Sequence, residues 1–376
     1  MPAPVDLMIL AGEPSGDAHG QQLIQELFAT HPDLKIAVVG GEKMRSQPVE
    51  LLFPMEKLCA MGFFDLLPAL PRLAYYFYNL RRLIIERSPK AVVCIDYPGF
   101  HLRLQNSLRK GGYQGKLIHY ICPSVWAWSK GRIRLMEQNL DLLLTIFPFE
   151  VSLFATTSLQ TVYVGNPSFK ELAKKCKKPY SLDRSSRTTK TIGIFPGSRK
   201  KEIRRNLPWQ IAAAQEFDAV PIVSCAEEKM LPFLHSLLGK ISPSIKIVPP
   251  EKRHELMQSV DCAYATSCTD TLELALCNTP TVVTFAIATR DYLLATKILG
   301  IDLPFYCIVN ILQNEEVFPE LFGPNLTKAR IKYFTRHWLA NEEKLEKCRK
   351  QLRLLHSCLE TTQSTASKEI LLEIGL

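Results

Sequence analysis

Residues 191–206, with the sequence TIGIFPGSRKKEIRRN, constrain the fold of this chain more than any other stretch. They open with a short β-branched run typical of a buried strand, which Pro196-Gly197-Ser198 then ends. Apolar residues follow at helical spacing: Ile203, Leu207, Ile211 and Ala214. A strand, a glycine turn and a helix together point free backbone N–H groups at an anion, and Arg199 lies at the turn. The segment therefore predicts either a phosphate site at Gly197, Ser198 and Arg199 or an ordinary turn with a solvated basic face.

Strand-like and helical segments alternate along the whole chain of 376 residues, a length typical of about two domains. Apolar runs of strand length occur at residues 7–11, 36–40, 91–95, 117–122, 142–147, 161–164, 192–195, 220–225, 245–248, 262–265, 281–285 and 306–312. Beyond Pro324 the pattern is helical, at residues 326–339, 342–359 and 367–376. We expect such a tail to pack back over the first domain. Such alternation predicts parallel sheets with helices on both faces.

This pattern divides the chain into an N-terminal Rossmann-like domain, a basic linker, a second Rossmann-like domain and a helical tail, at residues 1–170, 171–190, 191–325 and 326–376. The formal net charge of +9 points to an anionic partner: a phosphorylated ligand, an acidic membrane or nucleic acid. The eleven cysteines show no CxxC pair and no metal-ligand spacing, which favours a reducing cytosol. We expect neither a signal peptide nor a transmembrane helix, because no apolar run approaches about eighteen residues.

Acidic residues follow two of the predicted strands. Glu13 and Asp17 lie in the glycine-rich turn after the first strand, and Asp96 comes directly after the third. Open α/β sheets place their sites at the carboxyl ends of their strands, so Asp96 is a candidate general base. The alternative in each turn is a helix cap, formed by Ser15 or Asp17 in the first turn and by Asp96 in the second.

Two stretches combine aromatic and basic residues. Residues 53–78 are rich in phenylalanine and tyrosine, and arginines lie among and just after them, at Arg72, Arg81, Arg82 and Arg87. This stretch predicts either a membrane-interface segment or a core helix with a solvated basic face. Trp126 and Trp128 stand beside Lys130 and Arg132. These tryptophans could bind a sugar or a base, although tryptophans also fill protein cores.

The second half of the chain offers candidates for nucleotide recognition. Residues 266–273 follow a strand and carry the polar side chains Ser267, Thr269 and Glu273, which suit ribose and phosphate, although a capping box is the alternative. Asn310, in the last predicted strand, offers an amide to a base or a phosphate. Because the chain has no Asp-x-Asp, we expect no metal. Arg199 and a helix N-terminus would then neutralise a leaving diphosphate.

Six short motifs occur in the order in which one enzyme family has them. They are Gly12-Glu13-Pro14-Ser15-Gly16-Asp17, Ile95-Asp96-Tyr97-Pro98-Gly99-Phe100, Pro123-Ser124-Val125-Trp126-Ala127-Trp128, Phe147-Pro148-Phe149-Glu150, Val164-Gly165-Asn166-Pro167 and Pro196-Gly197-Ser198-Arg199. The chain closely resembles the lipid-A-disaccharide synthase family over nearly its full length. The fold expected from the residues and the resemblance is α/β, with two Rossmann-like parallel-sheet domains of the GT-B type facing across a cleft.

The resemblance implies an inverting transfer in lipid A assembly that needs no cofactor. UDP-2,3-diacylglucosamine would be condensed with 2,3-diacylglucosamine 1-phosphate (lipid X) to give UDP and a β-1,6-linked disaccharide 1-phosphate. The resemblance also implies a peripheral location on the cytosolic face of the inner membrane. It further implies a homodimer in which the C-terminal helices are exchanged.

Our mechanistic hypothesis assigns each candidate residue a role. Asp96 is the base and Glu13 its rival; the acceptor side comprises Ser15, Gly16, Asp17 and Trp126; the UDP side comprises Gly197, Ser198, Arg199, Ser267, Thr269, Glu273 and Asn310. By resemblance, lipid and membrane contacts fall on Phe63, Phe64, Leu66, Leu67, Leu70, Leu73 and Tyr76. The chain departs from the family pattern at Cys268, Val309 and Gly323, all on the donor side.

Two other hypotheses remain open. The first is another UDP-sugar enzyme on the same scaffold, such as a UDP-N-acetylglucosamine 2-epimerase or a peptidoglycan glycosyltransferase, which would not need the aromatic segment near residue 63. The second is a non-catalytic protein that binds nucleic acid through its positive charge. Its basic residues do not interleave with aromatics as a stacking platform would, except near residues 126–134. We therefore expect no nucleic-acid partner.

Overall fold

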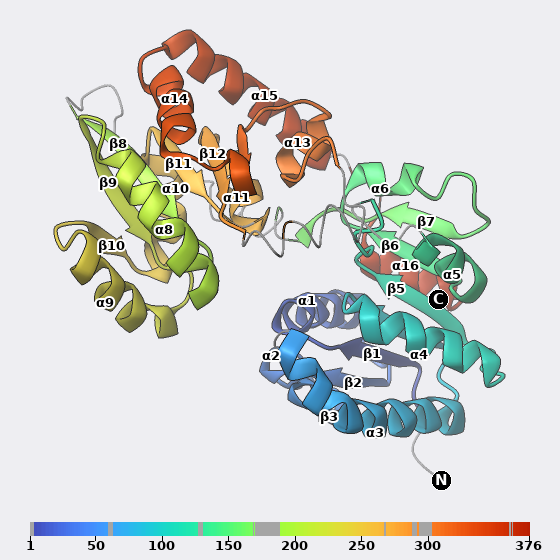
Figure 1. Cartoon of the computed structure of the whole chain (residues 1–376). Coiled ribbons are helices and arrows are strands. Elements are labelled where there is room, and N and C mark those ends of the chain that lie inside the picture. Colours follow the sequence, from blue (N-terminus) through green and yellow to red (C-terminus); the bar gives the residue numbers. More distant parts are fainter. Residues whose placement is uncertain are drawn as a thin grey trace. The chain divides into compact units, whose positions relative to one another are not determined.

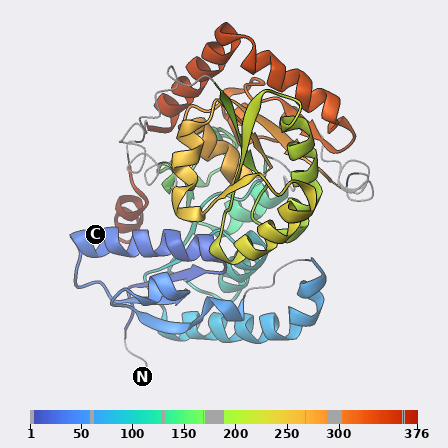
Figure 2. The same ribbon diagram turned by 90° about the vertical axis from the view of Figure 1, so that its left-hand side faces the viewer.

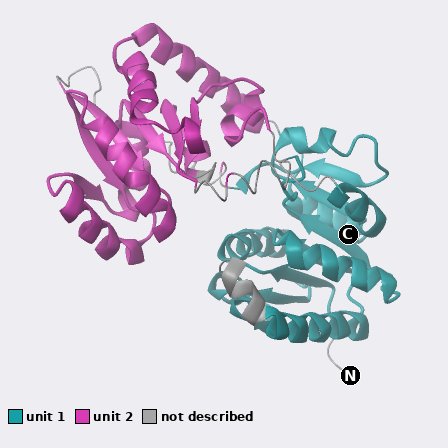
Figure 3. Cartoon of the chain, in the orientation of Figure 1, with its two compact units in different colours: residues 1–167, 361–376 teal, residues 168–360 magenta. Residues whose placement is uncertain are grey.

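A computed structural model describes residues 4–58, 63–126, 131–167, 169, 189–266, 268–287, 292, 303–360, 362 and 364–376. The chain forms two compact units (Figure 3). Unit 1 comprises Met1–Pro167 together with Thr361–Leu376, and unit 2 comprises Ser168–Glu360. In the described part of the chain, no helix has both the length and the apolar character needed to cross a membrane.

Unit 1 is built on a seven-stranded sheet in the order β3-β2-β1-β4-β5-β6-β7 (Figure 1). Its strands are β1 (Leu7–Ala11), β2 (Ile36–Gly40), β3 (Glu50–Pro54), β4 (Ala91–Ile95), β5 (Lys116–Tyr120), β6 (Leu142–Thr145) and β7 (Gln160–Tyr163). Every neighbouring pair is parallel. The central strands are buried on both faces, which explains why they read as unbroken apolar runs.

Helices cover both faces of this sheet. They are α1 (Pro14–Thr30), α2 (Glu42–Arg45), α3 (Phe63–Arg87), α4 (Pro98–Lys110), α5 (Gly131–Asn139), α6 (Pro148–Ser152) and α16 (Ala366–Glu373). Met8 and Leu10 of β1 face the core shared with α3, α4 and α5. Leu7 and Ile9 face the opposite core, which contains residues of α1 and α16. The alternate directions of side chains along a strand thus supply two hydrophobic layers from one apolar run.

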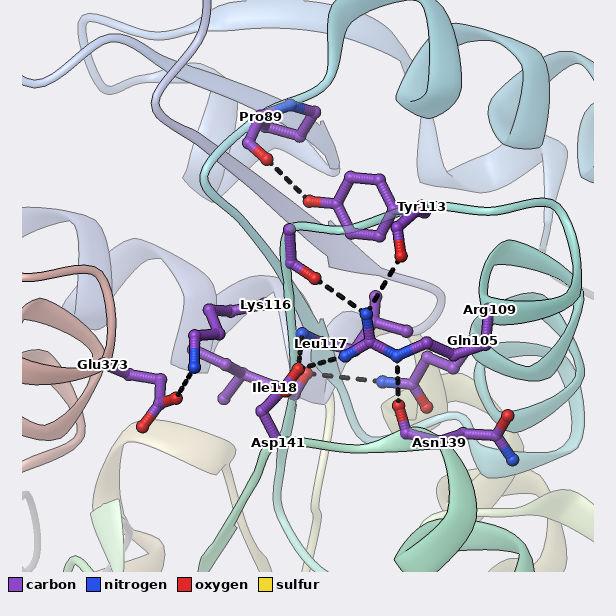
Figure 4. Close-up of polar contacts among 11 residues, drawn as sticks. Pro89, Gln105, Arg109, Tyr113, Lys116, Leu117, Ile118, Asn139, Asp141 and Glu373 are labelled. Atoms are coloured by element: carbon purple, nitrogen blue, oxygen red, sulfur yellow. Dashed lines mark hydrogen bonds and ion pairs between the residues drawn. The ribbon is translucent and has the colours of Figure 1, made fainter.

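The C-terminal helix α16 is fixed to unit 1 by polar as well as apolar contacts. It lies beside α1 (Figure 2), and Ser367 donates to Glu26 at 3.0 Å. Lys116, on β5, pairs with Glu373 of α16 at 2.7 Å (Figure 4). Helix α16 thus completes the fold of unit 1, although it follows unit 2 in the chain.

Arg109 organises the amino end of β5 (Figure 4). Its guanidinium donates to the carbonyl oxygens of Asn139, Tyr113 and Gly115 at 3.0–3.1 Å and pairs with Asp141. Asp141 also accepts the N–H of Leu117 at 2.6 Å. One cation thus satisfies three backbone carbonyls and one carboxylate at the junction of α4, β5 and β6.

Replacing Arg109 by Met is expected to lower the free energy of unfolding by about 3 kcal/mol, because it leaves a partly buried carboxylate and three carbonyls without their donor. The matched control is Arg82→Met, which removes an exposed ion pair with Glu86. That change is expected to cost less than about 1 kcal/mol. Denaturant unfolding of both variants measures the difference. Equal losses would show that the Arg109 network adds nothing beyond an exposed pair.

Unit 2 contains a six-stranded parallel sheet in the order β10-β9-β8-β11-β12-β13. Its strands are β8 (Lys190–Phe195), β9 (Ala219–Ser224), β10 (Lys246–Val248), β11 (Cys262–Ala265), β12 (Thr281–Phe285) and β13 (Glu320–Phe322). Its helices are α8 (Lys200–Ala214), α9 (Leu231–Ile241), α10 (Arg253–Ser259), α11 (Cys268–Leu276), α13 (Ile308–Gln313), α14 (Lys328–Leu339) and α15 (Glu342–Glu360). The predicted fold class, with two Rossmann-like parallel-sheet domains, is confirmed.

Two features of the predicted fold are wrong. Residues 306–312 do not form a strand; Ile308–Gln313 is the helix α13, and the edge position beside β12 is taken by β13. The helical tail does not return to unit 1 as a whole. Ile331, Trp338 and Leu345 of α14 and α15 belong to the core of unit 2, and only α16 joins unit 1.

Candidate active site

Glu13 and Asp96 are brought to one edge of the unit 1 sheet. The strands β1 and β4 are parallel neighbours, with Ala11 opposite Ile95, so the residues that follow them lie at the same carboxyl edge. Both side chains are half-buried. The sequence had placed each acid at the carboxyl end of its own strand, and the pairing of β1 with β4 brings those two ends side by side.

The Asp96 backbone has an unusual conformation. Asp96 and Tyr97 have φ values of 47° and 49°, the left-handed region that non-glycine residues seldom adopt. Each such residue costs about 1–3 kcal/mol and persists only where its surroundings hold it. The turn that carries the candidate base is therefore a strained one.

The surroundings of Asp96 suit a general base. Burial and, to a smaller extent, the negative charge of Glu13 together raise the pKa of its carboxyl to about 6. A base works best when its pKa lies close to the operating pH. Asp96 is therefore ionised at neutral pH and yet basic enough to accept a proton from an activated hydroxyl.

Gly12 allows Tyr97 to join the two turns. A Cβ atom placed on Gly12 would lie 2.3 Å from the Tyr97 ring, so only glycine permits this approach. The Tyr97 hydroxyl donates to the Leu58 carbonyl at 2.8 Å. The Glu13 turn and the Asp96 turn thus pack directly on each other.

The structure separates the remaining residues of the first turn. Ser15 is exposed and Gly16 is buried. Asp17 is buried and accepts the N–H groups of Gly41, Lys43 and Met44 at 2.7–3.1 Å, so its carboxylate caps α2. The predicted cap for Asp17 was on the first helix, whereas the observed one is on the second.

Glu150 is a third carboxylate near this edge, and the sequence interpretation gave it no role. It lies in the first turn of α6, after β6, is 2% exposed and accepts the Phe147 N–H at 3.1 Å. Burial raises its pKa to about 8, and Asp96 contributes in the same direction. Trp126, predicted for the acceptor side, is half-buried and hydrogen-bonds the Glu150 carboxylate. The position of Glu150 after a strand, like that of Asp96, was the signal in the sequence that could have identified it as a site residue.

The turn between β8 and α8 has the predicted form. Gly197 has φ 97°, and a Cβ atom there would lie 2.8 Å from the Glu202 carboxylate. Ser198 is half-buried. The Arg199 side chain is 82% exposed and pairs with Glu202 at 3.2 Å. The Arg199 guanidinium is thus available to a ligand at the start of α8.

Glu273 belongs to a charged cluster that the sequence interpretation missed. Arg253 pairs with Asp270 and, at 3.1 Å, with Glu273, while its guanidinium lies 5.9 Å from the centre of the Phe195 ring at the end of β8. Burial raises the pKa of Asp270 to about 6, although Arg253 acts in the opposite direction. Arg253 comes from α10, so only the fold could show this contact. Ser267 and the side chain of Thr269 lie outside the described residues.

Asn310 is buried within its own unit. Its Nδ2 donates to the Phe318 carbonyl at 2.7 Å and to Glu320 at 2.8 Å, and its Oδ1 accepts the N–H groups of Val317 and Phe318 at 2.9 Å. These four bonds use the whole capacity of the amide. Asn310 therefore supports the 317–320 segment, and the direct ligand contact predicted for it is not available in this conformation.

The residues predicted to contact lipid differ in exposure. Leu70 is 48% exposed, whereas Leu73 lies in the core and Tyr76 packs against it, 4.9 Å from the Phe53 ring. Leu73 is thus a core residue, contrary to prediction. The side chains of Phe63, Phe64, Leu66 and Leu67 lie outside the described residues. Within the described part of the chain, no three His, Cys, Asp or Glu side chains are grouped to hold a metal ion.

Comparison with known proteins agrees with this fold and these motifs. A Chlamydia muridarum lipid-A-disaccharide synthase is 41% identical over 84% of this chain, and a Myxococcus xanthus one is 29% identical over 100% of this chain and 98% of its own length. The chain spans about half the length of the chlamydial relatives it matches, 53% in the first case. The solved structure of CalG4, the calicheamicin glycosyltransferase, aligns with a TM-score of 0.57 over 99% of each chain at 12% identity.

The two parallel sheets and the structural match show that the chain has a GT-B-type fold. The family model for lipid-A-disaccharide synthetase matches residues 7–374 of the chain. The chain belongs to the lipid-A-disaccharide synthetase family.

Proposed function

We propose that this protein is an inverting glycosyltransferase of lipid A biosynthesis. It condenses UDP-2,3-diacylglucosamine with 2,3-diacylglucosamine 1-phosphate to give UDP and the β-1,6-linked disaccharide 1-phosphate. The observation that carries the proposal is the carboxyl edge of β1 and β4, where Asp96 has a pKa of about 6 beside Glu13. The family supplies the identity of the substrates and favours this reaction over an epimerase or a nucleic-acid-binding protein.

In the proposed reaction, Asp96 takes the proton from the 6-hydroxyl of the acceptor. The acceptor oxygen forms a bond to C1 of the donor sugar as the bond from C1 to the diphosphate oxygen breaks, so the configuration at C1 inverts. The electron pair of that bond leaves with UDP. Glu13 keeps the pKa of Asp96 high, and Ser15, Gly16 and Trp126 line the acceptor side.

On the donor side, the backbone N–H groups at Gly197 and Ser198 and the exposed Arg199 guanidinium would stabilise the departing diphosphate. Glu273 would accept hydrogen bonds from the ribose hydroxyls while Arg253 holds its carboxylate. Ser267 and Thr269 remain candidates for the same ligand. Asn310 would act indirectly, through Glu320.

We further propose a peripheral location on the cytosolic face of the inner membrane. Leu70, Tyr75 and Tyr78 of α3 are 48%, 64% and 69% exposed, and basic residues of the same helix could meet anionic lipid. A homodimer with exchanged C-terminal helices is also proposed from the family. In such an exchange, α16 would occupy on the partner the site that it fills here on its own unit 1.

The test is an assay of the purified protein with both acylated substrates in detergent micelles containing EDTA. We expect product to form in EDTA, because no step above needs a metal ion. Disaccharide phosphate and UDP should appear in equal amounts, because each transfer releases one of each. The matched control replaces the acylated donor by UDP-N-acetylglucosamine. Consumption of UDP-N-acetylglucosamine without disaccharide formation from the acylated pair would instead support an epimerase.

A further inference from the structure

The turn formed by Asp96 and Tyr97 needs an explanation for its stability. Among the residues that the structure describes, no other two consecutive non-glycine residues both have positive φ. Such a turn relaxes unless specific contacts hold it. If it relaxed, the Asp96 carboxylate would move away from Glu13.

Besides the first bonds of α4, which the Tyr97 carbonyl accepts from the N–H groups of Phe100 and His101, three described hydrogen bonds join this turn to its surroundings. The Asp96 N–H donates to the Tyr120 carbonyl at 2.9 Å, and the Tyr97 hydroxyl donates to the Leu58 carbonyl at 2.8 Å. The third joins His101 Nδ1 to the Asp96 carbonyl oxygen at 2.7 Å. A carbonyl oxygen can only accept, so His101 carries its proton on Nδ1. This is the one bond of the three in which a side chain acts on Asp96 itself.

His101 is suited to this fixed role. It lies on the first turns of α4 and is 0% exposed. Burial lowers its pKa to about 4, so the ring is neutral at physiological pH and the Nδ1–H tautomer is set by the bond to Asp96. The ring stacks edge-on against Tyr97, with centroids 5.7 Å apart, so it contacts both residues of the turn.

We propose that His101 is a positioning residue for the transfer: its bond to the Asp96 carbonyl keeps the Asp96–Tyr97 turn left-handed and the carboxylate at the sheet edge beside Glu13. This inference rests on the proposed function, in which Asp96 is the base. His101 itself touches neither substrate nor the transferred proton.

The chain offers a matched control. His119, on β5, is also 0% exposed, and its ring lies 6.4 Å from that of His101. Unlike His101, it makes no hydrogen bond with the turn among the described contacts. His119→Leu therefore reports the cost of changing this buried cluster without touching the turn.

Two substitutions at His101 separate the hydrogen bond from simple packing. Asn places its amide N–H where His places Nδ1–H, whereas Leu fills the space and cannot donate. We expect His101→Leu to lower kcat by about 100-fold, the scale of loss for a misplaced catalytic group, with KM values changed by less than about threefold. His101→Asn should recover at least about ten-fold of that loss, and His119→Leu should stay within about threefold of the parent enzyme.

Several outcomes would overturn the proposal: His101→Leu with near-normal kcat, Asn no better than Leu, or an equal loss in His119→Leu. If His101→Leu does not fold, His101→Asn and His101→Gln replace it. The Gln side chain is one methylene longer than that of Asn, so its amide N–H does not reach the position of Nδ1–H. His101→Gln should therefore have a lower kcat than His101→Asn. Hydrogen exchange at residues 96–101 gives a readout without activity: it should quicken in His101→Leu and not in His119→Leu. That result would still test the turn if the parent enzyme formed no disaccharide.

Discussion

Replacing Asp96 by Asn is expected to lower kcat by roughly a hundred- to ten-thousand-fold, the usual cost of losing a positioned general base. The amide keeps the size of the side chain but cannot accept the proton of the 6-hydroxyl. The matched variant is Glu13→Gln, which changes the neighbouring carboxylate and should cost far less. Rates measured under saturating substrate decide between them. Near-normal turnover in Asp96→Asn, with several orders of magnitude lost in Glu13→Gln, would transfer the role of base to Glu13.

The pH profile gives the same prediction a second readout. Asp96 must be ionised to act as a base, and its pKa is raised to about 6 by burial and by Glu13. The rate should therefore be constant above that value and fall tenfold per pH unit below it. Removing the negative charge in Glu13→Gln lowers the pKa of Asp96, so the acid limb of the profile should move to lower pH. A limb that stays in place would show that Glu13 does not act on Asp96.

Replacing Arg199 by Met is expected to lower kcat by roughly a hundred- to a thousand-fold, because a donor aimed at charge that develops on the leaving group is lost. The guanidinium is 82% exposed, and its ion pair with Glu202 lies at the surface, so the change should leave stability almost unaltered. Weaker product inhibition by UDP should accompany the lower rate.

Arg204→Met is the control for Arg199. Arg204 lies further along α8, with its guanidinium 5.0 Å from the centre of the Phe233 ring. Replacing it by Met removes the same charge as the Arg199 substitution. If both variants lose activity equally, the effect comes from the net charge of α8 and not from contact with the diphosphate.

The fold could be predicted because its dominant signals are local. Buried parallel strands such as β1 and β4 are continuous apolar runs, and each is followed by a helix. The errors arose where tertiary contacts decide the structure. Residues 306–312 are apolar enough for a strand, but Asn310 becomes buried by bonding Phe318 and Glu320, so this segment forms α13. The sequence pattern does not reveal those partners.

In the candidate site, too, local patterns could be predicted and tertiary contacts could not. Glu13 and Asp96 could be placed together because both follow strands, and parallel strands end at one edge. The contacts of Asp17 with Gly41 and of Arg253 with Glu273 join elements that are distant in the sequence, so no spacing rule predicts them. Sequence patterns thus located the ends of strands, while the fold determined which polar side chains are free and which are occupied.

The return of α16 to unit 1 has a consequence for how the protein is made. Domains usually fold in the order in which the ribosome delivers them. Here the apolar surface that Ile370 and Leu371 cover belongs to a sheet whose strands precede unit 2 in the chain, while the helix that covers it follows unit 2. The nascent unit 1 therefore keeps that surface uncovered through the whole synthesis of unit 2. Its folding becomes complete only once α16 has left the ribosome.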